Sequence, residues 1–178
     1  MKYVSCELAQ HGICFMKNKI QSCCYSVSDW INLDSKSVLL VPKYTGENLD
    51  WESIFALIEE RRANFKKGII PKACENCYWL KEAEWEDSNY INNIYITHFT
   101  ACNSQCIYCI EAFDASRNFY KNPYKILPIL KDMKKREIMP VGSEFHIGGG
   151  EPTIYNEMDA IIKEFALSGF AKRISVPS

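Results

Sequence analysis

Three cysteines within eight residues constrain the fold of this chain more than any other stretch. Cys102, Cys106 and Cys109 follow the apolar run 91–99, with three and then two residues between them. On a tight loop after a strand, the three sulfurs can face one point, as metal ligands do. No cysteine follows them, so the stretch supplies three thiolates where a closed tetrahedral site needs four. An iron–sulfur cluster bound in this way keeps one iron open to another ligand.

A glycine-rich segment lies about forty residues farther along the chain. Gly149, Gly150, Glu151 and Pro152 follow a run with the character of a strand, 144–147. Glycines let a backbone approach a ligand without a Cβ atom in the way, and the Glu151 carboxylate can pair with a cation. The cysteine spacing (CxxxCxxC), the aromatic residue before the last cysteine and this GGEP segment together resemble the radical S-adenosylmethionine (radical SAM) family.

This resemblance implies a cofactor, a reaction and a set of ligands. In the family, three cysteines hold three irons of a [4Fe–4S] cluster, and the fourth iron binds the amino and carboxylate groups of S-adenosylmethionine (SAM). An electron, delivered by a donor such as flavodoxin or ferredoxin, splits SAM into methionine and a 5′-deoxyadenosyl radical that removes a hydrogen atom from the substrate. Relatives often modify peptides or proteins. By resemblance, Cys102, Cys106 and Cys109 are the ligands, Tyr108 lies near the adenine, and 149–152 hold the methionine ammonium.

Simpler explanations exist for each of these residues. The three cysteines can form a zinc knuckle with His98 as fourth ligand, although His98 falls within the expected strand. The glycine run can be a flexible turn, and Tyr108 can be a packed aromatic residue. His146, on the second expected strand, is more often a hydrogen-bonded core histidine than a functional one. A cofactor site is therefore predicted only because the cysteines and the glycine run occur together.

The first half of the chain predicts a hairpin followed by a helix. Residues 12–25 place apolar segments on both sides of a short polar turn, which favours a β-hairpin, and 37–41 is a further apolar run. Asn48 or Asp50 can cap a helix that ends before Gly68. The residues that share one face of this helix, at spacings of three and four, are Trp51, Ile54, Phe55, Ile58, Arg62 and Phe65.

A second set of cysteines resembles the auxiliary iron–sulfur module called SPASM and its shorter relatives. A CxxC pair at 74–77 can hold one metal between its sulfurs. The order of cysteine, hairpin, double cysteine, helix with paired arginines and CxxC carries the resemblance over residues 6–80. It implies an auxiliary cluster, or alternatively a zinc ion, bound by Cys6, Cys23, Cys74 and Cys77. Cys24 and Cys14 are rival ligands, and Cys14 can instead be a buried small side chain.

The second half of the chain predicts alternating strands and helices. We expect strands at 91–99, 143–147 and 172–176, a helix starting at 122–123 or at Pro128, and a helix at 156–167. This order indicates an α/β fold with a parallel sheet. The resemblance implies a (β/α)6 barrel, of which the chain supplies only the first two to three β/α units, so the core is truncated. A polar connector with some helix, 79–93, would separate a small α+β cysteine-rich module (1–85) from this incomplete radical SAM core (90–178).

Composition narrows the function further. The chain has 178 residues, 47% of them hydrophobic, and a formal net charge of −1, so we expect neither nucleic acid nor a membrane as partner. The first ten residues lack the apolar core of a signal peptide, which favours a cytoplasmic protein. Nine cysteines in such a chain are more often metal ligands than disulfides. The alternative to a radical SAM enzyme is a catalytically inert metal-binding protein, structural or interacting, or a non-functional fragment.

Overall fold

The fold of the chain is a mixed α/β arrangement built on one large sheet. The structure is a computed structural model and describes residues 1–23, 39–99, 101–102 and 124–176. In this part of the chain the large sheet has six strands. Their order across the sheet is β4 (Leu39–Val41), β3 (Ile20–Gln21), β2 (Gly12–Phe15), β6 (Asn93–Ile96), β7 (Ser143–Ile147) and β8 (Ala171–Ser175).

Four neighbouring strands of this sheet are parallel. β2 pairs in parallel with β6, β6 with β7, and β7 with β8. The connections between the last three strands carry helix α3 (Leu127–Lys135) and the helical segment formed by α4 (Met158–Ile161) and a π-helical stretch (Ile162–Leu167). The expected order of strand, helix, strand, helix and strand is therefore confirmed, as is the α/β class. The expected hairpin is also confirmed, because β2 pairs with β3 in antiparallel fashion.

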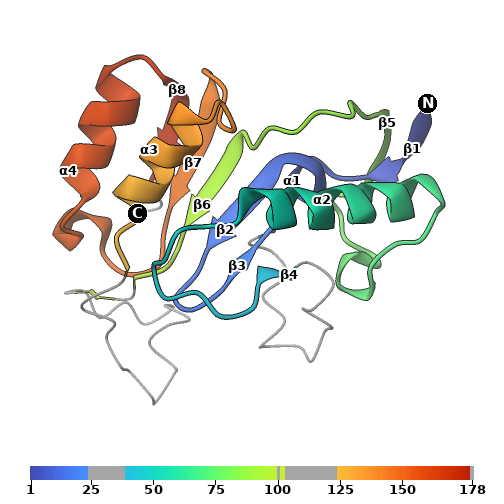
Figure 1. Cartoon of the computed structure of the whole chain (residues 1–178), viewed down its shortest axis with the longest axis horizontal. Helices are drawn as coiled ribbons and strands as arrows, with labels where there is room; N and C mark the ends of the chain where they lie inside the picture. The colour runs from blue at the N-terminus through green and yellow to red at the C-terminus, as the bar shows by residue number, and fades with distance from the viewer. Residues whose placement is uncertain (24–38, 100, 103–123, 177–178) are drawn as a thin grey trace.

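The longest helix, α2 (Trp51–Lys66), begins where the sequence predicts. Of the two expected caps, Asp50 is the one used, because its Oδ1 accepts a hydrogen bond from Ser53 N at 3.2 Å. Figure 1 shows α3 and α4 against β6 to β8, whereas α2 runs along β2 toward the N-terminal strand. All three helices contribute buried side chains to one core.

The strands alternate between two faces of the sheet. One face is apolar and lies in the core under the helices; its rows are Ile13, Ile94, Phe145 and Ile174, and Phe15, Ile96 and Ile147. The row between them, on the opposite face, is Cys14, Tyr95, His146 and Ser175. The apolar face explains why the helices stay on one side of the sheet.

A second, smaller core lies at the N-terminal end of the molecule. Its buried members are Tyr3, Cys6, Leu8, Ala9, Phe65 and Cys74. Here β1 (Lys2–Ser5) pairs with β5 (Lys81–Glu84), so the expectation of helix in the connector 79–93 is wrong over β5. The short helix α1 (Glu7–His11) and two 3₁₀ turns, Lys72–Cys74 and Pro152–Ile154, complete the described elements. The expected boundary between 85 and 90 stays a prediction, and the six-stranded sheet takes strands from both sides of it.

Within the described residues, no helix combines the length and the apolar character that crossing a bilayer requires.

Candidate functional site

The segment before Cys102 and the glycine run are directly hydrogen-bonded to each other. Both leave the sheet at the carboxyl ends of neighbouring parallel strands, since Ile96 on β6 lies opposite Ile147 on β7. Three backbone N–H groups of the glycine run donate to carbonyl oxygens at or beyond the end of β6: Gly148 to Ile96 (2.9 Å), Gly150 to Phe99 (3.0 Å) and Glu151 to Ala101 (2.8 Å). The glycine run is thus joined to the segment directly before the cysteine motif, about forty residues away in sequence. Ligands of parallel α/β sheets bind at this edge.

Gly149 is required by this close approach. Its φ of +100° is one that L side chains rarely adopt, and a Cβ atom there would lie 2.3 Å from the carbonyl oxygen of Phe99. The glycine therefore lets the two segments lie side by side. In the structure, the small size of Gly149 allows the contact with Phe99. The family resemblance instead implies that the glycine run binds the cofactor.

Glu151 and Pro152 begin a short turn beside the glycines. The Glu151 carboxylate accepts hydrogen bonds from Thr153 N (3.0 Å) and Thr153 Oγ1 (2.8 Å), and these bonds lower its pKa. Pro152 is buried at the start of the 3₁₀ turn. The carboxylate is ionised at neutral pH and held in one orientation, as pairing with an ammonium group requires.

Of the expected cluster ligands, the structure describes only Cys102, which is half-buried directly after Ala101. Cys106, Cys109 and Tyr108 lie outside the described residues. Their convergence with Cys102, and the place of Tyr108 near an adenine, therefore stay predictions.

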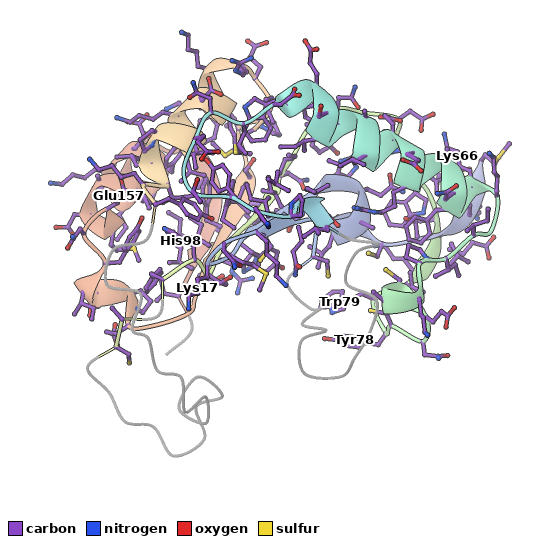
Figure 2. All side chains as sticks on the ribbon, turned by 60° about the horizontal axis from the view of Figure 1, so that its bottom comes forward. Lys17, Lys66, Tyr78, Trp79, His98 and Glu157 are labelled. Atoms are coloured by element: carbon purple, nitrogen blue, oxygen red, sulfur yellow. The ribbon has the colours of Figure 1, made fainter. Side chains whose placement is uncertain are left out.

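A chain of hydrogen bonds links His98, which precedes residues 103–123, to Ile126, which follows them. His98 Nε2 lies 3.0 Å from the Tyr155 hydroxyl, which donates to Glu157 Oε2 at 2.6 Å. The same carboxylate oxygen accepts from Ile126 N (2.7 Å) and Leu127 N (3.3 Å) at the start of α3. Figure 2 shows His98 and Glu157 in the same half of the molecule. These contacts link residues that precede and follow the segment carrying Cys106 and Cys109.

Burial keeps the His98 imidazole neutral. Its side chain is fully buried and packs edge-on against Tyr155 and close to Tyr124. Desolvation lowers the pKa of His98 to about 4, against smaller opposite effects of the Tyr124 backbone and Glu157. The neutral imidazole contacts Tyr155 through Nε2, and the alternative of His98 as a zinc ligand stays untested.

The four cysteines expected at the auxiliary site line a single cavity. It lies in the smaller core, beside the 3₁₀ turn Lys72–Cys74, and measures about 30 Å³. Its lining contains Cys6, Cys23, Cys74 and Cys77, together with Ser22, Trp79 and apolar neighbours. Figure 2 shows Trp79 at the opposite side of the molecule from His98 and Glu157. The four cysteines therefore share one location, and their role as metal ligands stays a prediction.

The thiols of this cavity act on one another electrostatically. Burial raises the pKa of Cys6 to about 12; a hydrogen bond of 3.3 Å from Ala9 N opposes this, while the other three cysteines add to it. Burial also raises the pKa of Cys74 to about 11, with Cys23 raising and Arg61 lowering it. Metal binding would have to displace these protons, because a thiolate is the binding form.

The thiols line the cavity without closing around one point. Among the residues that the structure describes, no three His, Cys, Asp or Glu side chains are arranged to hold a metal ion as they stand. The cavity has room for a single ion or a little water. The four irons and four sulfides of a [4Fe–4S] cluster need more space, so the thiols would have to move apart to hold one.

The structure places the alternative ligands and the second candidate histidine differently from the four cavity cysteines. Cys14 is fully buried on β2, with its sulfur 3.7 Å from Thr97 Oγ1, and it does not line the cavity. Cys24 lies outside the described residues. His146 Nδ1 lies 2.7 Å from Ser175 Oγ, and its ring stacks on Tyr95 at a centroid distance of 4.4 Å. His146 thus has the hydrogen-bonded partner expected of a structural histidine.

Sequence reasoning missed two groups of residues around these sites. Tyr155 and Glu157 support the chain after the glycine run, and Arg61 donates to Ser22, which lines the cysteine cavity. A charged residue beside the apolar face of a predicted helix is the available signal for Arg61. Tyr155 and Glu157 act through contacts with residues about thirty or more positions away, which no local pattern contains.

No family model, curated protein or solved structure matches the chain. The resemblance to radical SAM proteins therefore depends on the sequence motifs alone.

Proposed function

We propose that this chain is a radical SAM protein. Cys102, Cys106 and Cys109 would hold a [4Fe–4S] cluster, and the open iron of that cluster would take SAM. The observation that carries the proposal is the hydrogen-bonded pairing of the segment before Cys102 with the glycine run, including Glu151 N to Ala101 O at 2.8 Å. Neither motif alone is specific, but their meeting at the carboxyl edge of a parallel sheet fits a shared ligand.

In this proposal the protein residues bind and orient the cofactor. The ionised Glu151 carboxylate, held by Thr153, would pair with the ammonium group of the methionine part of SAM. Gly149 would keep the glycine run against Phe99, so that the run stays at a fixed distance from the cysteine segment. When bound, the reduced cluster would supply the electron that splits SAM into methionine and a 5′-deoxyadenosyl radical.

We also propose an auxiliary metal centre at Cys6, Cys23, Cys74 and Cys77. Its support is the common cavity that these four residues line. The resemblance favours an iron–sulfur cluster, whereas the cavity size of about 30 Å³ favours a single ion such as zinc. A protein with only such a structural metal site is the second candidate function.

The remaining parts of the proposal follow from the family resemblance. The three parallel strands β6, β7 and β8 would belong to a partial (β/α)6 barrel, residues 90–178. A flavodoxin or ferredoxin would deliver the electron, a peptide or protein would be the substrate, and the cytoplasm would keep the thiols reduced.

The test is anaerobic reconstitution of the full chain with iron and sulfide, followed by reduction and addition of SAM. We expect 5′-deoxyadenosine from the wild-type chain and none from a Cys102→Ala, Cys106→Ala, Cys109→Ala triple variant. The Cys14→Ala variant is the matched control, since Cys14 is buried beside Thr97 and does not line the cysteine cavity. A colourless protein that loads zinc and leaves SAM intact would support the inert metal-binding alternative instead.

A further inference from the structure

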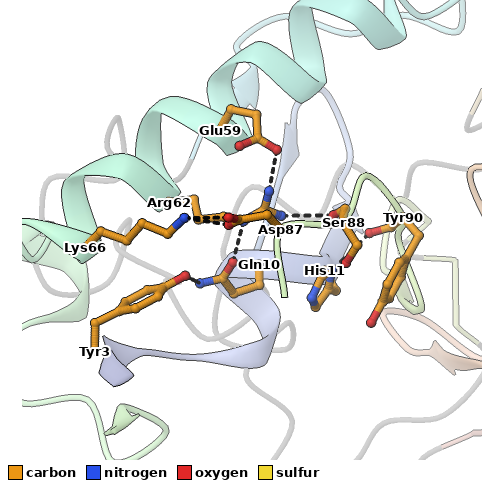
Figure 3. A network of polar contacts seen from close by, with 9 residues as sticks. All are labelled: Tyr3, Gln10, His11, Glu59, Arg62, Lys66, Asp87, Ser88 and Tyr90. Atoms are coloured by element: carbon orange, nitrogen blue, oxygen red, sulfur yellow. Dashed lines mark hydrogen bonds and ion pairs between the residues drawn. The ribbon is translucent and has the colours of Figure 1, made fainter. Parts of the chain in front are cut away.

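Two consecutive buried arginines of α2 point to different surroundings. Arg62 is 2% exposed and bonds to Gln10 Oε1 (2.7 Å) and Ser88 O (3.0 Å), and it pairs with Glu59. Figure 3 shows this network, which continues to Tyr3 through the Gln10 side chain. Arg61 is 6% exposed and donates from Nη1 to Ser22 Oγ at 2.6 Å. The two charges are similarly buried on one helix, but Arg62 belongs to the network around Gln10, whereas Arg61 reaches toward the cysteines.

The Arg61 guanidinium is hydrogen-bonded to the wall of the cysteine cavity. Ser22, which accepts its hydrogen bond, lines the cavity together with Cys6, Cys23, Cys74 and Cys77. Burial lowers the pKa of Arg61, while Cys74, Cys6 and Cys23 raise it by attraction to their thiolate forms. Three of the four thiols thus lie within electrostatic reach of one buried cation.

A buried cation beside neutral thiols is costly. Removing a charge from water is unfavourable, and hydrogen bonds to neutral groups offset only part of that cost. The cost of burying the cation falls when a divalent metal ion binds four cysteines. Each thiol then gives its proton to the solvent, and the centre becomes a dianion. A tetrathiolate iron–sulfur centre is likewise negatively charged. In both cases the guanidinium gains an opposite charge in a low-dielectric surrounding.

We infer that Arg61 is the counter-charge of an anionic tetrathiolate metal centre formed by Cys6, Cys23, Cys74 and Cys77, positioned through Ser22. The inference depends on the auxiliary centre proposed above and adds the charge state of its occupant. Arg61 would act as a positioning and electrostatic residue and not as a ligand. If the occupant is an iron–sulfur cluster, the same cation would favour the more negative reduced form and raise the reduction potential.

The test measures Co²⁺ binding to the full chain under reducing, anaerobic conditions. The parent carries the Cys102→Ala, Cys106→Ala, Cys109→Ala substitutions, so that only the N-terminal cysteines contribute thiolate-to-cobalt absorption. In this parent, Arg61→Met and Arg61→Gln remove the charge, Arg61→Lys keeps it, and Arg62→Gln is the matched control for loss of a buried cation from the same helix. We expect the two charge-removing changes at Arg61 to weaken Co²⁺ binding roughly 10- to 100-fold, as loss of outer-shell partners does. Arg61→Lys should retain most of the affinity, and Arg62→Gln should leave it within about threefold.

Stability of the metal-free protein separates this role from a merely structural one. Replacing a buried charge by an apolar side chain of similar volume is often neutral or stabilising. We therefore expect Arg61→Met to keep or raise the midpoint of thermal unfolding without metal, while the rise in that midpoint on adding Co²⁺ becomes smaller. Equal Co²⁺ affinity in the parent, Arg61→Met and Arg62→Gln would overturn the counter-charge role while leaving the metal centre intact. Absence of thiolate-to-cobalt absorption in the parent would defeat the metal centre itself, and with it this inference.

Discussion

The backbone N–H of Glu151 donates a 2.8 Å hydrogen bond to the carbonyl oxygen of Ala101, the residue directly before Cys102. This bond joins the glycine run to the residue that leads into the cysteine motif. Any change that moves the glycine run also moves the start of the cysteine segment. The first prediction uses this dependence.

Gly149→Ala should destabilise the protein more than a change at a glycine of similar backbone conformation. The new Cβ would meet Phe99 O at 2.3 Å, in addition to the strain of a φ of +100°. Strain alone costs about 1–2 kcal/mol, and a forced shift of packed backbone adds roughly 1–3 kcal/mol. We expect urea unfolding to show a loss of about 3 kcal/mol, the sum of these two costs, accompanied by less iron retained after reconstitution.

Gly142→Ala is the control for this change. Gly142 has a φ of +92°, and a Cβ atom there would meet nothing within 4 Å. It should therefore cost only the strain, about 1–2 kcal/mol. Equal losses for the two variants would show that the approach of Gly149 to Phe99 contributes nothing to stability.

Much of the fold could be predicted because the strongest patterns are local. Residues only a few positions apart encode the apolar stripe on α2 and its Asp50 cap. The same is true of the apolar alternation of β7. The pairing of β1 with β5 was missed because Lys81–Glu84 is polar and gains its strand form from Lys2–Ser5, about eighty residues away. The parallel pairing of β2 with β6 is equally non-local, and no property of either strand alone specifies it.

Cys74→Ala should reduce the metal content of the protein, and Cys14→Ala should not. Both thiols are buried, but only Cys74 lines the cavity with three other cysteines. Loss of one of four thiolate ligands should leave less than half of the wild-type zinc or iron at the N-terminal site, measured in the background without Cys102, Cys106 and Cys109. Cys14→Ala should cost about 1 kcal/mol of stability through the lost sulfur contacts and leave the metal content unchanged. The opposite pattern would assign a ligand role to Cys14.

Acidification should destabilise the protein through His98. The folded-state pKa of this buried imidazole is about 4, below its ordinary value of 6.5. Between these two pH values the unfolded chain binds a proton that the folded chain does not, so the contribution present above pH 6.5 is lost as the pH falls toward 4. The difference between these two pKa values corresponds to a loss of roughly 3 kcal/mol in the free energy of unfolding at most.

The measurement is urea unfolding at several pH values, compared between the wild type and His98→Gln. A glutamine side chain can still hydrogen-bond to Tyr155 but does not titrate in this range. The variant should therefore lose stability less steeply than the wild type on acidification. Burial also lowers the pKa of His11 and His146, so part of the slope should remain in the variant. Identical slopes would mean that His98 contributes no pH dependence.

Cysteine is scarce enough that the resemblance could single out a set of four, and these four residues line one cavity, while their role as metal ligands stays a prediction. The supporting residues could not be found in this way. Arg61 and Tyr155 are of common types, and their roles come from the partners that the fold brings to them, Ser22 in one case and His98 with Glu157 in the other.

A double-mutant cycle should detect the coupling of Tyr155 with Glu157. Tyr155→Phe removes a hydroxyl that donates to Glu157 Oε2 and lies 3.0 Å from His98, at an expected cost of about 1–3 kcal/mol. Glu157→Gln keeps an acceptor for the N–H groups that begin α3 but loses the charge that strengthens these bonds, at a cost of about 1 kcal/mol. Because the two residues share one hydrogen bond, the double variant should lose roughly 1 kcal/mol less than the sum of the single changes.

Tyr44→Phe is the matched control, since that hydroxyl donates to Glu47 O and not to Glu157. Combined with Glu157→Gln, it should give additive losses within about 0.5 kcal/mol. Additivity in both cycles would mean that Tyr155 and Glu157 act independently. With coupling in the first cycle only, the same variants should also retain less iron at Cys102, because the network anchors Ile126 after the cysteine segment and His98 before it.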